Sequence, residues 1–259
     1  MSATTLTAPI PVDTTGIHTH PSLGRLVAVE LRKIVDTRAG FWMQVATVVL
    51  TAVVVIARLA VGEAADHTFA SVLTVAIKPA AVLLPVAGIL LVTSEWSQRT
   101  GMVTFALVPQ RSRVIAAKLV ASLLLTAAML AATVGIAAAG VAVATPDAAW
   151  SDAPVLVGQS AVYLGGGMLT GVGFGMVLLA SAPAIVTLFA LPIAWTAVAS
   201  LSFLASAAPW LDTRLALGPM PEEVMNGTQW AHAGTALAIW MLVPLAIGTW
   251  RITRRKVAA

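Results

Sequence analysis

The chain has 259 residues, of which 59% are hydrophobic and only 10% are charged, and its mean hydropathy is +0.92. A soluble domain of this size carries about a quarter charged residues. The composition therefore excludes an ordinary soluble domain and indicates that lipid is the solvent for much of the chain. The absence of cysteine excludes disulfides, thiolate metal sites and cysteine nucleophiles.

Residues 1–21 are rich in Thr and Pro and lack the apolar core of a signal peptide. We expect them to form a disordered cytoplasmic tail. Residues 22–40 are too charged to cross a membrane, but a helical winding gathers their apolar side chains on one face and their charged ones on the other. We interpret the segment as an amphipathic helix in the membrane interface, with a simple basic flank to the first span as the alternative. The apolar face contains Leu23, Leu26, Val27, Leu31, Ile34 and Val35, and the charged face contains Arg25, Arg32, Lys33 and Asp36.

Continuous apolar stretches follow, each near the 20 residues that a membrane-spanning helix needs. Barrel strands would be shorter and would alternate in polarity, so we predict an all-α integral membrane protein. The transmembrane domain is expected over residues 41–250, followed by a basic cytoplasmic tail at 251–259. The six expected spans are Phe41–Val61, Phe69–Thr93, Val114–Ala144, Pro154–Ala180, Ala184–Ala208 and Ala233–Trp250.

The basic residues are distributed unevenly between the two sides that these spans define. Segments on the side of the termini contain Arg25, Arg32, Lys33, Arg38, Arg99, Arg111, Arg113, Lys118, Arg251, Arg254, Arg255 and Lys256. Arg58, Lys78 and Arg214 are the remaining three. Because cytoplasmic loops are enriched in Lys and Arg, the bias predicts that both termini are cytoplasmic. It also accounts for the net charge of +4 without nucleic acid as a partner.

Several motifs that could carry chemistry are missing or incomplete. The glycine-rich fourth span has no preceding strand and no following Lys-Ser/Thr, so it is not a nucleotide loop. Its Gly167, Gly171 and Gly175 recur every four residues, a spacing that lets another helix approach closely. No P-loop or HExxH is present, and no serine-histidine-aspartate arrangement can be proposed. We therefore expect no enzyme activity, cofactor or metal in this chain.

Lys78 is the charge that lies deepest in an expected span, several residues into the second. An ionisable residue inside the membrane is a functional candidate. The side chain could line a polar cavity that contacts substrate, or it could extend to the nearer interface. The sequence leaves both interpretations open.

The loop at 94–118 joins the second and third spans on the predicted cytoplasmic side. Its residues 100–107 can form a short helix, which Pro109 would end at the preceding residue. Ser112 can cap the helix that becomes the third span. An apolar-aromatic helix between basic residues is typical of a docking surface, although a solvated basic loop is the simpler alternative.

This loop resembles that of bacterial ATP-binding-cassette transporter permeases of the export type. The resemblance covers residues 22–256 and departs at Gln110, where the family often has Arg. The matching residues are Glu95-Trp96, Arg99-Thr100, Thr104-Phe105, Pro109, Arg111, Arg113 and Ala117-Lys118.

The resemblance implies the permease subunit of an exporter in the bacterial plasma membrane, moving an amphipathic drug, lipid or natural product. It implies a second copy of this permease or a paralogous one, and separate cytoplasmic ATPase subunits that bind ATP and Mg. Residues 100–107 would be the coupling helix, with Glu95, Arg99, Thr100, Thr104 and Phe105 contacting the ATPase and Arg111 and Arg113 flanking it. The alternative is a membrane anchor or sensor that docks a cytoplasmic partner without transport.

Overall fold

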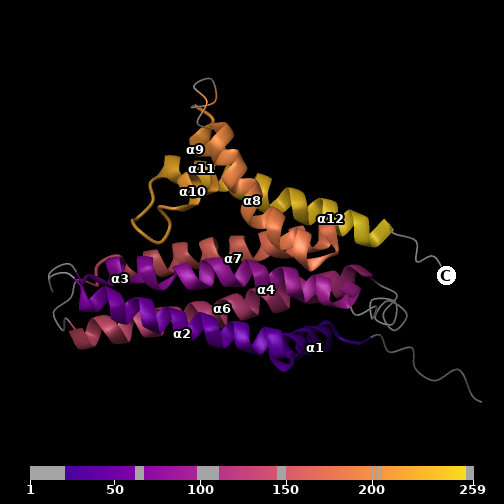
Figure 1. The fold of residues 1–259 in the computed structure, drawn as a ribbon, viewed down its shortest axis with the longest axis horizontal. Coiled ribbons are helices and arrows are strands. Elements are labelled where there is room, and N and C mark those ends of the chain that lie inside the picture. The colour runs from indigo at the N-terminus through magenta and orange to yellow at the C-terminus, as the bar shows by residue number, and fades with distance from the viewer. Residues whose placement is uncertain are drawn as a thin grey trace, which may run out of the picture.

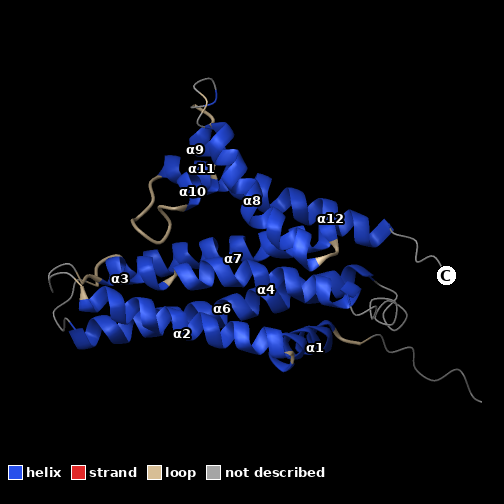
Figure 2. Cartoon of the chain, in the orientation of Figure 1, coloured by secondary structure: helices blue, strands red, loops and turns tan. Residues whose placement is uncertain are grey.

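Six helices of the chain are long and apolar enough to cross a membrane, in agreement with the predicted spans. The computed structural model describes residues 21–61, 67–97, 111–144, 150–199, 201, 204 and 206–254. Within these residues the regular structure is entirely helical (Figure 2). The prediction of an all-α, six-span membrane protein is therefore confirmed.

The predicted amphipathic segment forms α1 (Leu23–Asp36), a helix separate from α2 (Arg38–Ala60), which is the first span. Ser22 caps α1 by accepting a hydrogen bond from the Arg25 amide, and Thr37 caps α2 in the same way. The chain turns sharply between the two helices, and a side chain at Gly40 would collide with the carbonyl oxygen of Ile34. Glycine at position 40 therefore allows α1 to fold against the bundle.

The second span is broken into α3 (Phe69–Ala76) and α4 (Lys78–Ser97). Pro79 lies in the first turn of α4, where its missing amide is tolerated, and its ring disfavours helical geometry at the preceding residue. Lys78 therefore lies at a break in the span, as the first residue of α4.

The third and fourth spans are α6 (Arg111–Ala144) and α7 (Ala153–Leu178). Leu179 ends α7 in the left-handed conformation, with φ of 56°, and donates its amide to the carbonyl of Gly175. This turn leads directly into α8 (Ser181–Ala199), the fifth span, as an antiparallel hairpin. The prediction that the fifth span reaches Ala208 is wrong, because α8 ends at Ala199.

A compact element follows α8 and contains the short helices α9 (Ala208–Leu211) and α10 (Thr213–Leu217). Asp212 caps α10 through the Arg214 and Leu215 amides, and its other carboxylate oxygen accepts from the Thr196 hydroxyl. The sixth span comprises α11 (Gly227–Leu237), a π-helical turn at Ala238–Leu242, and α12 (Val243–Arg254). Asn226 and Gln229 form a capping box at its start.

Figure 1 shows α2, α3, α4, α6 and α7 running side by side as a bundle, while α8, α11 and α12 make up a second group, of which α8 and α12 contact α7. We call the end of the bundle that holds α1, the end of α4 and the start of α6 the basic end. The distal end is the opposite one, where α2 ends and α3 begins. The element containing α9 and α10 lies beside α11 at the start of the sixth span.

Candidate functional site

Four charged side chains meet at the basic end of the bundle, and we call them the ion network. Glu30 and Lys33 come from α1, Glu95 from the last turn of α4, and Lys118 from the third turn of α6. Lys33 Nζ lies 2.9 Å from Glu30 Oε1 and 2.6 Å from Glu95 Oε1. Lys118 Nζ lies 2.8 Å from Glu30 Oε2 and 3.0 Å from Glu95 Oε1. Acids and bases therefore alternate around a closed ring.

Three of the four side chains of the ion network are buried. The side chains of Glu30, Glu95 and Lys118 are 5%, 6% and 7% exposed, whereas Lys33 is 37% exposed. Lys118 also donates to the carbonyl oxygen of Leu91 at 3.3 Å. Buried charges are tolerated only when they are paired and hydrogen-bonded, and the two acids and two bases here balance to zero.

The Lys33 ammonium illustrates the electrostatics of the ion network. Burial by itself lowers the pKa of Lys33, but the hydrogen bonds and charges of Glu95 and Glu30 outweigh it and raise the pKa above its ordinary value. From the sequence, Lys33 was placed on the charged face of α1; in the structure its side chain is half-exposed and its ammonium bonds Glu30 and Glu95. The side chain turns toward the bundle because two carboxylates lie there.

The ion network joins the two helices between which the predicted docking loop runs. Glu95 lies near the end of α4 and Lys118 near the start of α6, and both are bonded to α1. Two further contacts tie α12 to the same end of the bundle. Arg111 donates to the carbonyl oxygen of Ile252 at 2.9 Å, and Arg251 donates to that of Val177. A force on the loop would therefore reach α1, α4, α6 and α12 together.

The predicted docking residues fall partly outside the part of the chain that the structure describes. Arg99, Thr100, Thr104 and Phe105, with the whole predicted coupling helix, lie there. Glu95 was predicted to contact a partner, but its carboxylate contacts Lys33 and Lys118 within the chain. Arg111 contacts the end of α12, and Arg113 is half-buried near the start of α6.

Gly167, Gly171 and Gly175 of α7 face α4. A side chain at Gly171 would collide with the carbonyl oxygen of Pro85, and one at Gly175 would come within 3.2 Å of the Ile89 backbone. At Gly167 the nearest atom would be the Pro85 ring, at 3.4 Å. Close approach of two backbones brings many atoms into contact, which is how helices associate in lipid. The α4–α7 pair is therefore the most closely packed part of the bundle.

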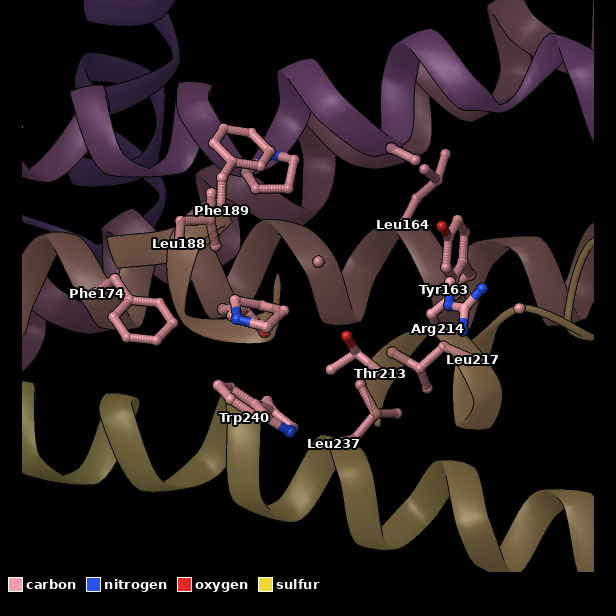
Figure 3. Close-up of a pocket in the computed structure, with 16 residues that line it drawn as sticks. Tyr163, Leu164, Phe174, Leu188, Phe189, Thr213, Arg214, Leu217, Leu237 and Trp240 are labelled. Carbon is pink, nitrogen blue, oxygen red and sulfur yellow. The ribbon is translucent and has the colours of Figure 1, made fainter. Parts of the chain in front are cut away.

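A cavity of about 330 Å³ lies between this pair and the second group of helices (Figure 3). Pro85, Gly167 and Phe174 line one side, and the other side comes from α8, α10 and the sixth span. Figure 3 shows Phe174 and Leu188 at one end of the cavity, and Tyr163 and Arg214 together at the other. The cavity is therefore apolar along most of its length and polar at the α10 end.

The element containing α10 is fixed over the cavity by hydrogen bonds. Gln159 of α7, only 3% exposed, donates to the carbonyl oxygens of Met220 and Glu223, both at 2.7 Å. Its own carbonyl accepts from the Met225 amide at 2.9 Å. On the opposite side, the Trp240 indole donates to the carbonyl oxygen of Leu211 at 2.8 Å. These contacts hold Arg214 at the cavity edge.

Lys78 does not line this cavity. It lies on a separate, more open groove between α2 and the α3–α4 span, where Arg58 is the other charged residue. Lys78 is exposed on that surface. The structure therefore places Lys78 on the outside of the bundle.

Sequence reasoning missed Glu30, Lys33 and Lys118 as members of one site. The spacing of Val27, Glu30 and Ile34 puts Glu30 on the buried face of α1, and this carboxylate on an apolar face was the available signal. Nothing in the sequence pairs Glu30 with Lys118, which is 88 residues away. The described residues contain no group of three His, Asp or Glu side chains that could hold a metal ion.

Comparisons with protein-family models and with curated proteins find no match to this chain.

Proposed function

We propose that this chain is the permease subunit of an ATP-driven exporter, with its basic end in the cytoplasm. The observation that carries the proposal is the ion network, which bonds α1 to both helices that bound the loop at residues 98–110. That loop and the helix ends beside it bear the residues by which the chain resembles exporter permeases. A docking loop needs a rigid connection to the spans, and the ion network provides one.

In the proposed mechanism, separate ATPase subunits bind ATP and Mg, close on one another and move the loop. The ends of α4 and α6 then move with α1, and the α4–α7 contact carries the motion along the bundle. The cavity widens or narrows because its other wall belongs to α8, α10 and the sixth span. The permease shifts between states only if they differ in affinity for open and closed ATPase.

The cavity supports an amphipathic substrate. Its volume of about 330 Å³ is at the small end of the range for sites that bind drug-sized molecules. Aliphatic and aromatic side chains would hold an apolar body, while Tyr163 and Arg214 would contact a polar group at the α10 end. The cavity lies within one chain, and a second copy or a paralogous permease would complete the transporter.

The proposed orientation follows from charge. The ion network, Arg111, Arg251 and Arg254 lie at the basic end, which the enrichment of Lys and Arg assigns to the cytoplasm of a bacterial plasma membrane. Arg254 also lies over the ring of Trp250 at 5.6 Å, as expected for a helix end at a membrane interface.

The test is a double substitution in the loop, Thr104→Asp with Phe105→Asp. The full chain is purified from its native membrane in mild detergent, and the preparation is assayed for ATP hydrolysis. We expect the wild-type chain to retain an ATPase subunit and the double variant to lose it, because two carboxylates replace the hydroxyl and aromatic groups of the docking surface. The control is Arg214→Gln, which changes a residue at the cavity edge far from the loop in sequence. ATP hydrolysis that co-purifies equally with the wild-type chain and the double variant would contradict the proposal.

A further inference from the structure

The outer surface of the first two spans contains a groove of about 590 Å³ between α2 and the α3–α4 span. Its lining is aliphatic apart from two cations, Arg58 and Lys78. The groove is open to the surroundings of the bundle, and Leu50 and Val82 on its walls are 45% and 51% exposed. The aliphatic residues are Leu50, Val54, Ala57, Val75, Pro79, Val82 and Leu83.

The depth of Lys78 makes its surroundings unusual. Lys78 lies nine residues beyond Phe69, where the span begins, which at 1.5 Å per residue is about 13 Å along the helix. The hydrocarbon core is about 30 Å thick, so the backbone of Lys78 lies well inside it. Among the described residues, the Lys78 ammonium has no hydrogen bond or ion pair. A charge at this depth needs a counter-charge or a route to the interface.

Arg58 lies in the last turn of α2, closer to the distal end than Lys78. Its guanidinium donates to the carbonyl oxygen of Val61 at 3.2 Å, which keeps it at the end of the helix. The same groove is lined by both cations and, farther along α2, by Leu50. Lys78 lies deeper, but its long apolar stem can extend along the groove toward Arg58 and bring the ammonium nearer the interface. An occupant therefore meets both cations toward the distal part of the groove and aliphatic surface toward the middle of the membrane.

We propose that this groove binds an anionic phospholipid from the leaflet at the distal end of the bundle. The phosphate of the headgroup contacts Arg58 and Lys78, and an acyl chain lies along Leu50, Val54 and Val82. Charge complementarity selects the lipid, because a headgroup of net negative charge meets two basic side chains in the groove, whereas a zwitterionic headgroup has no net charge. The acyl chain replaces no polar contact, since the rest of the groove is aliphatic.

The groove is distinct from the cavity beneath α10, with which it shares no residue. The inference therefore does not depend on the proposed transport function. A bound lipid would hold α2 against the second span at the break between α3 and α4, where Lys78 lies.

The test is a lipid titration of the purified full chain by native mass spectrometry, with dioleoyl phosphatidylglycerol and dioleoyl phosphatidylcholine as the probes. A cation near a membrane surface contributes about 1 kcal/mol to the binding of an anionic lipid, which is about fivefold in affinity. We expect Lys78→Gln and Arg58→Gln each to lose about fivefold in phosphatidylglycerol binding and the double variant to lose about 25-fold. Lys78→Arg retains the charge and should bind as the wild type does.

The matched control is Arg32→Gln, which removes an exposed cation of α1 outside both the groove and the cavity and should leave phosphatidylglycerol binding unchanged. Equal binding of the two lipids by the wild-type chain would overturn the inference, as would unchanged phosphatidylglycerol binding in the double variant. The absence of cysteine also allows a test for a second copy of the chain as the occupant. A disulfide-linked dimer formed by Val82→Cys in the membrane would show that another protomer covers the groove, and the lipid site would be refuted.

Discussion

The α4–α7 pair and α8 are both membrane-spanning, yet they are packed in opposite ways. In the most apolar stretch of each helix, 56% of the residues are buried in the spans that contain α4 and α7, but only 17% in α8. Glycines on α7 bring its backbone against that of α4, whereas α8 stands beside a cavity that contains no comparable contact. The comparison distinguishes a closely packed unit, α4 with α7, from α8, which buries far fewer of its side chains within the chain.

The helices α4 and α8 also differ in their polar contacts. The ion network ties α4 to α1 and α6 at the basic end, through buried charges. The polar contacts of α8 include a hydrogen bond between the Ser181 and Thr93 hydroxyls and one donated by Thr196 to Asp212. We therefore expect stability to reside in the closely packed unit and the ion network, and function in the cavity beside them.

The largest effect is expected for Lys118→Met. Removing this ammonium leaves the buried Glu30 and Glu95 carboxylates without one of their two partners, and breaking a buried ion pair costs about 3–5 kcal/mol. The thermal unfolding midpoint of the purified chain in detergent should fall by roughly 10 °C. Arg32→Gln, which removes an exposed cation of α1, is the control and should change the midpoint little. A midpoint for Lys118→Met equal to that of the control would show that the ion network does not stabilise the bundle.

A smaller loss is expected for Gly171→Ala. The added methyl group would collide with the Pro85 carbonyl oxygen, so α4 and α7 must separate, and overpacking of this kind costs about 1–3 kcal/mol. Gly158→Ala is a matched control on the same helix, because nothing lies within 4 Å of the methyl group it adds. Alanine is the better helix former, so the control should be neutral or slightly stabilising in the same thermal assay. Equal midpoints for the two variants would disprove the close contact.

Thr170→Phe should change stability by less than about 1 kcal/mol, because its side chain extends into the cavity and displaces no packed group. Binding of an amphipathic fluorescent dye to the purified chain should nevertheless be lost. Thr235→Phe is the control, since Thr235 lies outside the cavity and is half-buried like Thr170, and its hydroxyl also bonds the carbonyl four residues earlier. Dye binding that survives in Thr170→Phe would exclude the cavity as the site.

The smallest effect is expected from the pH dependence of Lys33. The pKa of Lys33 is raised in the folded chain. The contribution of its charge to the free energy of unfolding is therefore fully present below the ordinary lysine pKa of about 10.4. The contribution is lost as the pH rises through the raised folded-state pKa. The difference in thermal midpoint between the wild type and Lys33→Met should therefore be constant from pH 7 to 9 and shrink above about pH 10.4. Solvent screens this half-exposed group, so the difference is only a few degrees. A difference that grew at alkaline pH would contradict the assigned sign.

Much of the fold could be predicted from the sequence because the bilayer imposes a local rule. Each span must be about 20 apolar residues and must satisfy its own backbone hydrogen bonds, so the first four spans were located closely from hydropathy. The sixth was expected from Ala233 but begins at Gly227. The fifth was extended too far, because residues 200–208 are apolar enough to continue it. Composition could not show that Asp212 and Trp240 fold the following chain into a separate element.

The candidate site was less predictable. The spacing of Gly167, Gly171 and Gly175 indicated a packing face, but only the structure identifies α4 as the helix against it. Glu95 was assigned to a partner because the loop around it resembles a docking surface. Its contacts with Lys33 and Lys118 depend on how α1 folds back over the bundle, which no local pattern determines.

By itself, the sequence determined that this protein is helical, where its spans lie and which segments carry the basic residues. These properties follow from the free energy of transferring each segment from water to lipid, and that free energy depends on local composition. The tertiary structure alone decided that Glu30, Lys33, Glu95 and Lys118 form one ring, and that Lys78 lies on an outer groove. Such arrangements depend on contacts between side chains that are distant in sequence, because a buried charge is stable only where the fold brings a counter-charge to it.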